Sequence, residues 1–358
     1  MHVVHVIYHL DIGGGEVFLR GIARALASRG IAQHVFTVGP RGRLAGEIEA
    51  AGIPVVAFNK SSKAGLVAIV RMAAALRRLR PTLVQTHGEA GLFWGVPAAR
   101  LAGAPVVSLI YQTREETALK TLATRAALRL PARVIAGSRA AAEFIRERFR
   151  VSSTHLLTIY CGIEPALSHT TGRPAQRHPE WPVLVTVGRL VAAKGHRILI
   201  EALPILRRHY PNARLVIVGE GPEQHALERQ AERAGVARAV TFAGTLYPTT
   251  DVLAKAHVFV FPSLNEPQGL ALLEAYAAGV PVVASRTGGI LEMLEHEVDG
   301  LLVDPGDALA LAAAIRRLTD DEALQSACVA HARRRLRAFD VEVLAAQYLE
   351  MYRAVDTP

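Results

Sequence analysis

The chain has 358 residues, of which 51% are hydrophobic, and a chain of this length is expected to form two domains. Its two cysteines, Cys161 and Cys328, exclude a disulfide framework and a cysteine-rich metal site, and they favour a reducing, cytoplasmic compartment. The net charge of +9 comes from the first half, because residues 1–170 carry +11 and residues 171–358 carry −2.

Short apolar runs alternate with helical patterns from the amino terminus onward, which is typical of parallel α/β sheets. The opening MHVVHVIYHLDIGGGE has no basic leader and no small-residue cleavage site, so it predicts a strand and not a signal peptide. No apolar run approaches the ~20 residues of a membrane helix. We expect helices over 17–28 and 66–79 and strands over 3–8, 33–38, 54–58, 83–86, 106–110, 134–136 and 156–159.

Residues 162–182 break this rhythm with Pro, Gly, Ser and Thr, which predicts a linker. The alternation then restarts, which predicts a second doubly wound domain. Ligands of such sheets bind at the carboxyl ends of the strands. In this half we expect strands over 183–187, 214–218, 240–242, 258–261, 280–284 and 301–303 and helices over 195–209, 223–234, 268–278 and 307–318.

The basic excess of the first half suits an anionic partner: phospholipid headgroups, an acidic glycan or nucleic acid. Nucleic acid fits least, because the arginine runs are not interleaved with aromatic residues. Residues 112–130, with Arg114, Lys120, Arg125 and Arg129 beside Leu and Ala, form an amphipathic basic segment that could lie on anionic lipid. An ordinary solvated arginine-rich surface is the other interpretation.

The stretch NEPQGLALLEAYAAG, residues 265–279, carries two carboxylates eight positions apart, Glu266 and Glu274. We expect Glu266 in a loop that faces the ligand and Glu274 deeper, in a helix that begins near Gln268. The free amides of its first turn suit phosphate, and a charge within LALLEAYAAG is costly without a partner. The two acids therefore predict a site that holds one ligand by its hydroxyl groups, although surface charges are the simpler interpretation.

Two further clusters follow predicted strands. In VGRLVAAKG, Arg189 and Lys194 place two cations beside a helix start, which suits a diphosphate. In GGGE, residues 13–16, glycines permit close backbone approach to phosphate or sugar. Neither this turn nor VGEGPEQ, residues 218–224, completes the dinucleotide fingerprint, which argues against a hydride-transfer enzyme.

These segments resemble the retaining glycosyltransferases of family 4, also called glycosyl transferases group 1, which have the two-Rossmann GT-B fold. The resemblance runs through LDIGGGE, VGRLVAAKG, LVIVGEGPE, VTFAGTL, NEPQGLALLEAYAAGVPVVAS and GLLVDPGD. It implies an acceptor-side domain over 1–165, a linker over 166–182 and a nucleotide-sugar domain over 183–339. The last helix, from about 340 to 358, would pack back on the first domain.

The resemblance also implies roles for individual residues. Arg189 and Lys194 would bind the donor diphosphate, Glu274 the ribose, and Glu266 the hydroxyls of the transferred sugar. His87, at the end of its strand, is the first-domain candidate for contact with sugar or acceptor, and a structural histidine is the alternative. The remaining donor contacts would come from Gly269 and Leu270 at the diphosphate, from Gly219, Glu220, Gly244, Thr245 and Leu246 beside the base, and from Gly14 and Gly15 of the other domain.

Three positions depart from the family pattern. Gln85 replaces the first His of D-V-V-H-x-H, Tyr111 stands where many members carry a His near the sugar, and Cys161 replaces the Asn of I-P-N-G-V-D. The Tyr111 substitution leaves open which first-domain group acts at the reaction centre. Cys161 is interpreted as a small hinge-side residue and not as a nucleophile.

The implied reaction moves a hexose from a UDP- or GDP-sugar to a glycan or lipid-linked acceptor in cell-envelope polysaccharide or lipopolysaccharide assembly. The diphosphate would leave from the face that the acceptor hydroxyl enters, so the configuration is retained. No cofactor beyond the donor is implied, and the absence of D-x-D predicts metal independence. A nucleotide-sugar epimerase or hydrolase and a non-catalytic nucleotide-sugar-binding paralogue are the alternatives.

Overall fold

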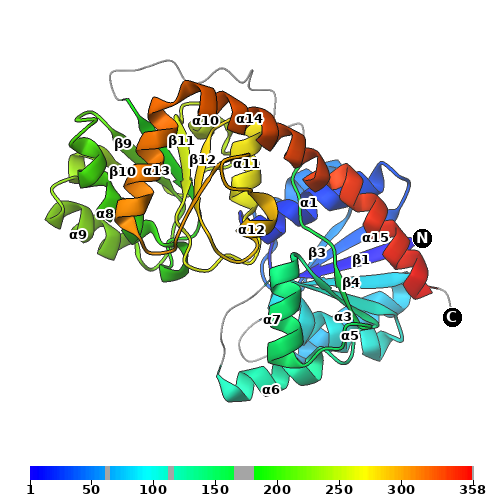
Figure 1. Ribbon diagram of the computed structural model, residues 1–358. Coiled ribbons are helices and arrows are strands. Elements are labelled where there is room, and N and C mark those ends of the chain that lie inside the picture. Colours follow the sequence, from blue (N-terminus) through cyan, green and yellow to red (C-terminus); the bar gives the residue numbers. More distant parts are fainter. Residues whose placement is uncertain (61–64, 112–116, 165–180, 357–358) are drawn as a thin grey trace. The chain divides into compact units, whose positions relative to one another are not determined.

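The computed structural model describes residues 1–60, 65–111, 117–164 and 181–356. These residues form two compact units, each built on a parallel sheet (Figure 1). Unit 1 comprises Met1–Glu164 and Phe339–Pro358, and unit 2 comprises Pro165–Ala338. Most of the linker predicted over 166–182 lies outside the described residues.

The sheet of unit 1 has, in its described part, seven parallel strands in the order β3-β2-β1-β4-β5-β6-β7. The strands are short, and the five between the two edge strands are mostly buried, because helices cover both faces of such a sheet. The strands are β1 (His2–Ile7), β2 (Ala32–Thr37), β3 (Val55–Ala57), β4 (Leu83–His87), β5 (Val106–Ile110), β6 (Arg133–Ala136) and β7 (Leu156–Thr158).

The described helices of unit 1 include the carboxyl-terminal helix α15, which packs on α1. Its buried residues Leu344, Tyr348 and Tyr352 repeat every four positions and so form one apolar face. The ring of Tyr348 lies 6.1 Å from that of Phe18 on α1. The helical segments are α1 (Gly14–Ala27), α2 (Ala45–Ala50), α3 (Gly65–Leu79), α4 (Gly88–Ala90), the π-helical turn η1 (Gly91–Gly95), α5 (Val96–Ala102), α6 (Ala118–Ala127), α7 (Arg139–Phe149), η5 (Arg337–Phe339) and α15 (Val341–Asp356).

The described part of unit 2 repeats this plan with six parallel strands in the order β10-β9-β8-β11-β12-β13. The reversal of strand order between β8 and β11 marks the point where α/β sheets bind ligands. The strands are β8 (Val183–Val187), β9 (Arg214–Val218), β10 (Val240–Phe242), β11 (Val258–Phe261), β12 (Val282–Ser285) and β13 (Leu301–Val303).

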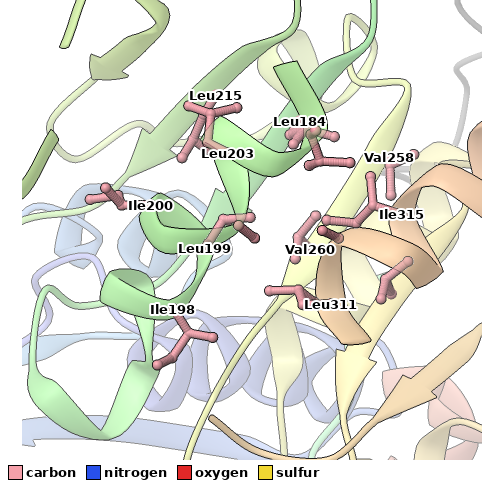
Figure 2. Packing of buried hydrophobic residues seen from close by; sticks show 14 of the residues in the cluster. Leu184, Ile198, Leu199, Ile200, Leu203, Leu215, Val258, Val260, Leu311 and Ile315 are labelled. Carbon is pink, nitrogen blue, oxygen red and sulfur yellow. The ribbon is translucent and has the colours of Figure 1, made fainter. Parts of the chain in front are cut away.

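The core of unit 2 lies between its sheet and the helices α8 and α13. Figure 2 shows Leu199 and Leu203 of α8 and Ile315 of α13 directed at strand residues that include Val258 and Val260. The segments of this unit are η3 (Ala192–Lys194), α8 (His196–Arg207), α9 (Gln224–Arg233), η4 (Ala237–Ala239), α10 (Thr250–Leu253), α11 (Leu270–Ala278), α12 (Ile290–Met293), α13 (Ala308–Asp320) and α14 (Glu322–Leu336). The two parallel α/β sheets confirm the predicted fold class.

Candidate functional site

In unit 2, two pairs of charged residues follow neighbouring strands at the carboxyl edge of the sheet, and one residue of each pair contacts the other pair. Arg189 and Lys194 follow β8, whereas Glu266 and Glu274 follow β11. The two strands are neighbours and pair in parallel, so the segments that leave them lie side by side. Sequence segments more than 70 residues apart thus contribute to one surface.

Backbone contacts fasten the two segments together. The amides of Leu264 and Asn265 both donate to the carbonyl oxygen of Ala193, at 2.8 and 3.2 Å. Gly195 has a φ of 65°, and a Cβ at this position would lie 1.9 Å from the carbonyl oxygen of Pro262. Only glycine fits this approach, so the end of the Lys194 loop is held against the end of β11.

Lys194 and Glu266 form an ion pair. The Nζ–Oε2 distance is 2.5 Å, and Ser263 Oγ donates to the same carboxylate oxygen at 3.2 Å. The Glu266 side chain is 6% exposed, against 23% for Lys194. The expected depths are therefore wrong: Glu266 is the buried acid, which a lysine and a serine satisfy, and Glu274 is only half-buried.

Helix α11 carries Glu274 in its second turn. It begins at Leu270, two residues later than expected, because Gly269 adopts a φ of 99° directly before it. Its N-cap residue is Gly269, which has no side chain to cap the amides of the first turn. Thr249 Oγ1 donates to Glu274 Oε2 at 2.8 Å, and sequence reasoning did not identify this partner.

A second unexpected feature supports the Glu266 loop from the β12 side. Gly288 has a φ of 49°, and its Cβ would lie 2.1 Å from the carbonyl oxygen of Glu266. The amide of Gly289 donates to that same oxygen at 2.9 Å. The sequence signal for this support is the pair of glycines after β12, Gly288 and Gly289.

The predicted base-side residues are joined by backbone hydrogen bonds. Gly219 donates to the carbonyl oxygen of Gly244 at 2.8 Å, and Glu220 Oε1 accepts from the amide of Thr245 at 3.2 Å. Gly219, with a φ of 129°, lies so close to Gly188 that its Cβ would be 2.0 Å from that carbonyl oxygen. Leu246 is 39% exposed beyond this turn.

His196, the first residue of α8, holds the backbone that carries Arg189. Its Nε2 lies 3.3 Å from the carbonyl oxygen of Arg189, so this nitrogen donates. Burial lowers the pKa of His196 to about 4, and the ring is neutral at physiological pH. The Arg189 guanidinium itself is exposed, and no described residue forms an ion pair with it.

At the carboxyl edge of unit 1, the predicted residue His87 ends β4 and lies 2% exposed. Its Nε2 is 3.1 Å from His5 Nδ1, and its Nδ1 is 2.9 Å from the hydroxyl of Tyr111. Both ring nitrogens therefore have partners within the protein. Burial lowers the pKa of His87 well below its usual value, so the ring is neutral.

The glycine turn of unit 1 lies against Tyr111. Gly14 begins α1, and a Cβ on Gly15 would meet the Tyr111 ring at 3.1 Å. Of the other departures from the family pattern, Gln85 accepts a hydrogen bond from the Tyr352 hydroxyl and so ties α15 to the sheet. Cys161 is buried and is not part of a disulfide.

Two absences hold for the described residues. They contain no group of three His, Cys, Asp or Glu side chains that could hold a metal ion. Their helices include none that is long and apolar enough to span a membrane.

Comparison with known proteins places this geometry in a family. Residues 12–167 match Glycosyltransferase Family 4, and residues 171–335 match Glycosyl transferases group 1. The glycogen synthase of Mycobacterium tuberculosis is 33% identical over 311 residues, which cover 80% of this chain and 73% of that protein. The lipopolysaccharide core biosynthesis glycosyltransferase LpsD of Rhizobium meliloti is 36% identical over 199 residues, which cover 53% of this chain and 57% of that protein.

Among solved structures, Anabaena Alr3699/HepE in complex with UDP-glucose superposes with a TM-score of 0.89 at 24% identity. The match covers 99% of this chain and 100% of that chain, which establishes a common fold. Taken with the sequence matches over both halves, this likeness shows that the chain belongs to the retaining, nucleotide-sugar-dependent glycosyltransferases of family 4, with the GT-B fold.

Proposed function

We propose that this protein transfers a hexose from UDP- or GDP-sugar to a glycan or lipid-linked acceptor of cell-envelope polysaccharide or lipopolysaccharide assembly. The observation that carries this proposal is the contact of Lys194 with Glu266, which joins the loop after β8, where Arg189 also lies, to the segment after β11 that continues to Glu274. Two cations, two acids and an open helix start suit a molecule that has a diphosphate between two hydroxyl-bearing sugars.

The charges at this edge favour catalysis by stabilising the leaving group. As the bond between the sugar anomeric carbon and the diphosphate oxygen breaks, negative charge grows on the diphosphate. Arg189, Lys194 and the first-turn amides of α11 are placed to stabilise this charge. The acceptor oxygen forms the new bond to the anomeric carbon, and its proton passes to the departing phosphate oxygen, so no side-chain base is needed.

Glu266 holds the transferred sugar in this proposal. The hydrogen bonds that its carboxylate receives from Lys194 and Ser263 both end on Oε2. Oε1 is then the oxygen that accepts from a sugar hydroxyl. Glu274, oriented by Thr249, accepts from the ribose in the same way. Gly14 and Gly15 stay predicted donor contacts, as do the residues of the base-side turn.

The proposal is tested by a nucleotide-sugar screen. Thermal shift with UDP, GDP, UDP-glucose and GDP-mannose should find a stabilising ligand, and Arg189→Ala should weaken its binding. Loss of one such cation should lower the transfer rate by roughly a hundredfold. Arg197→Ala is the matched control, because Arg197 is an exposed cation of α8 that pairs only with Glu201 among the described residues. Failure of every nucleotide to bind at millimolar concentration would overturn the proposal.

The rival functions give different results in the same screen. A hydrolase or epimerase consumes the sugar nucleotide without an acceptor, at a rate that added glycan does not change. A non-catalytic paralogue binds the nucleotide and consumes nothing. Stimulation of donor consumption by a glycan acceptor, with retained anomeric configuration in the product, supports the transferase.

We also propose that catalysis needs no metal ion. Arg189 and Lys194 supply the positive charge that a metal ion would otherwise supply. Donor consumption should be unchanged by excess EDTA. Abolition by EDTA with recovery on addition of Mn²⁺ would contradict this proposal.

An anionic membrane is the partner that we propose for the basic half of the chain. A hollow of about 480 Å³ in unit 1 is lined by four arginines, Arg125, Arg129, Arg133 and Arg150, and by no acidic residue. Leu119 and Leu122, which precede Arg125 on α6, are 80% and 63% exposed. Exposed leucines next to arginines suit the interface of anionic phospholipid.

Vesicle sedimentation tests this partner. Phosphatidylglycerol vesicles should retain the protein at low salt, whereas phosphatidylcholine vesicles should not. The double substitution Arg125→Gln/Arg129→Gln should release it. Arg229→Gln/Arg238→Gln removes two exposed charges from unit 2 and is the control of equal net charge. Equal binding of both double variants to phosphatidylglycerol vesicles would contradict the proposed contact.

A further inference from the structure

Four polar side chains form a row of hydrogen bonds across the sheet of unit 1. Gln33 lies on β2, His5 on β1, His87 at the end of β4, and Tyr111 directly after β5, so the row crosses four neighbouring strands. The three links measure 3.0, 3.1 and 2.9 Å in this order. Three of the four side chains are at least 95% buried, and Tyr111 is partly exposed.

The strand register explains why these residues meet. Each member of the row lies two residues beyond the position that pairs with the member before it, and residues two apart on a strand share a face. The row therefore climbs diagonally on one face, from inside the sheet to its carboxyl edge. The pairs that set this step are Gln33 with Val3, His5 with Gln85, and His87 with Leu109.

The inner end of the row sets the direction of every hydrogen bond. Gln33 Nε2 lies 2.8 Å from the carbonyl oxygen of Ala23, which can only accept. The amide oxygen of Gln33 therefore faces His5, and His5 Nε2 must carry the proton. A neutral His5 then has a bare Nδ1, which accepts a hydrogen bond.

The same argument continues to the outer end. Because His5 Nδ1 accepts, His87 Nε2 must donate, and a neutral His87 then has a bare Nδ1. The proton for that last link comes from the hydroxyl of Tyr111. Burial keeps both histidines neutral, since it lowers the pKa of His5 to about 4 and that of His87 well below its usual range. Burial also raises the pKa of Tyr111, so the hydroxyl keeps its proton.

We propose that Tyr111 contacts the substrate and accepts a hydrogen bond from one of its hydroxyl groups. Its proton is committed to His87, so the oxygen offers only lone pairs to a ligand. Gly15 and Gly88 lie against its ring, and Tyr111 directly follows β5 at the carboxyl edge, where α/β sheets bind ligands. His87, His5 and Gln33 are then positioning residues. This inference rests on the proposed transferase function.

Packing alone does not account for the row. Buried polar groups can be replaced by apolar residues of similar shape with little loss of stability, so a polar row in a sheet interior needs another reason. The row fixes the direction of its hydrogen bonds. It makes the end residue an acceptor toward the ligand, and it selects a hydroxyl over a carboxylate or a phosphate oxygen, which cannot donate when ionised.

The directions can be measured without any substrate. In protein labelled with ¹⁵N-histidine, NMR at pH 7 should show both His5 and His87 as neutral rings with the proton on Nε2. In Gln33→Leu the fixed acceptor is lost, and the two rings should show mixed tautomers. A proton on Nδ1 of either ring in the unaltered protein, or a charged ring, would overturn the inference.

The role toward substrate is measured by kinetics with UDP-glucose and its deoxy analogues. Tyr111→Phe should lower kcat/KM about tenfold, the effect of one lost hydrogen bond. Tyr210→Phe removes a hydroxyl that is hydrogen-bonded to Asp320 on unit 2 and should have no effect. Gln33→Leu should raise KM and add nothing in combination with Tyr111→Phe, because both changes act through the same oxygen.

The kinetic measurements show whether the contacted hydroxyl belongs to the donor or to the acceptor. If Tyr111→Phe leaves kcat/KM unchanged for one deoxy analogue of UDP-glucose, the hydroxyl that this analogue lacks is the one that Tyr111 contacts. If Tyr111→Phe slows transfer but not donor hydrolysis, the hydroxyl belongs to the acceptor. Unchanged kinetics in both assays would overturn the substrate contact. Failure of all nucleotides to bind would overturn the transferase function, while the NMR result would still decide the directions of the row.

Discussion

The ammonium group of Lys194 lies 2.5 Å from the carboxylate of Glu266, although 72 residues separate them in the chain. Each was expected to contact a different part of the donor. The lysine charge is neutralised by an acid that is almost fully buried. In the proposed function, the diphosphate shares Lys194 with Glu266, and the exposed Arg189 is the cation whose charge is not balanced by a described acid.

Substitutions of Lys194 alone and of Lys194 together with Glu266 should distinguish the contribution of this ion pair to stability from its contribution to catalysis. Lys194→Met should lower the transfer rate roughly a hundredfold, and it should destabilise unit 2 by about 1–3 kcal/mol, because Glu266 loses its partner. Lys194→Met combined with Glu266→Gln should recover much of the stability and none of the activity. Urea denaturation and initial rates measure the two effects. Full activity in the double variant would contradict the assigned roles.

Thr249→Val should affect nucleotide binding more than the rate of transfer. Thr249 Oγ1 orients the Glu274 carboxylate, which is proposed to hold the ribose. Loss of this hydrogen bond should raise the Kd for the nucleotide about fivefold to tenfold. Calorimetric titration measures the change. Thr250→Val is the matched control, since the neighbouring side chain forms no hydrogen bond with a described residue, and an equal effect of both substitutions would refute the orienting role.

Gly288→Ala should disrupt the Glu266 loop. The new Cβ would lie 2.1 Å from the carbonyl oxygen of Glu266, so the loop must move. The control is Gly235→Ala, because Gly235 also has a positive φ of 67° but no heavy atom within 4 Å of its would-be Cβ. Both changes should cost about 1–2 kcal/mol of backbone strain, but only Gly288→Ala should abolish donor binding. Intact binding in Gly288→Ala would show that the loop does not depend on this contact.

The sequence was most informative where one periodicity dominates. The strand over 183–187 and the helix over 66–79 agree with β8 and α3 to within one residue, because long apolar patterns leave little choice of boundary. The run VPVVAS was less decisive: its strand starts at Val282 and not at residue 280, because the chain turns at Gly279 and Pro281 has no amide to donate.

The contents of the candidate site were harder to predict than the fold. The charged residues stand out in the sequence, because Glu266 precedes an apolar helix and Glu274 interrupts it. Their partners do not stand out. Thr249 and Ser263 are ordinary loop residues in the sequence, and only the folded chain brings them to the carboxylates. The row from Gln33 to Tyr111 was equally hidden, since its pattern depends on strand order and register.

Acid should weaken both units before the carboxylates titrate. His5 in unit 1 and His196 in unit 2 each have a pKa lowered from 6.5 to about 4 by burial. Between these values the unfolded chain binds protons that the folded chain excludes, so the free energy of unfolding falls as the pH drops from 6.5 to 4. Each histidine should remove up to about 3 kcal/mol.

The two tryptophans allow this effect to be followed one unit at a time. Trp94 lies in unit 1 and Trp181 in unit 2, so Trp181→Phe and Trp94→Phe each leave one fluorescent reporter. Urea midpoints should be constant from pH 7 to 8 and should fall below pH 6.5 in both units. His196→Gln should flatten the acid response reported by Trp181 and leave that of Trp94 unchanged. His225→Gln, which removes an exposed histidine, should flatten neither. An acid response of unit 2 that survives His196→Gln unchanged would show that other groups control it.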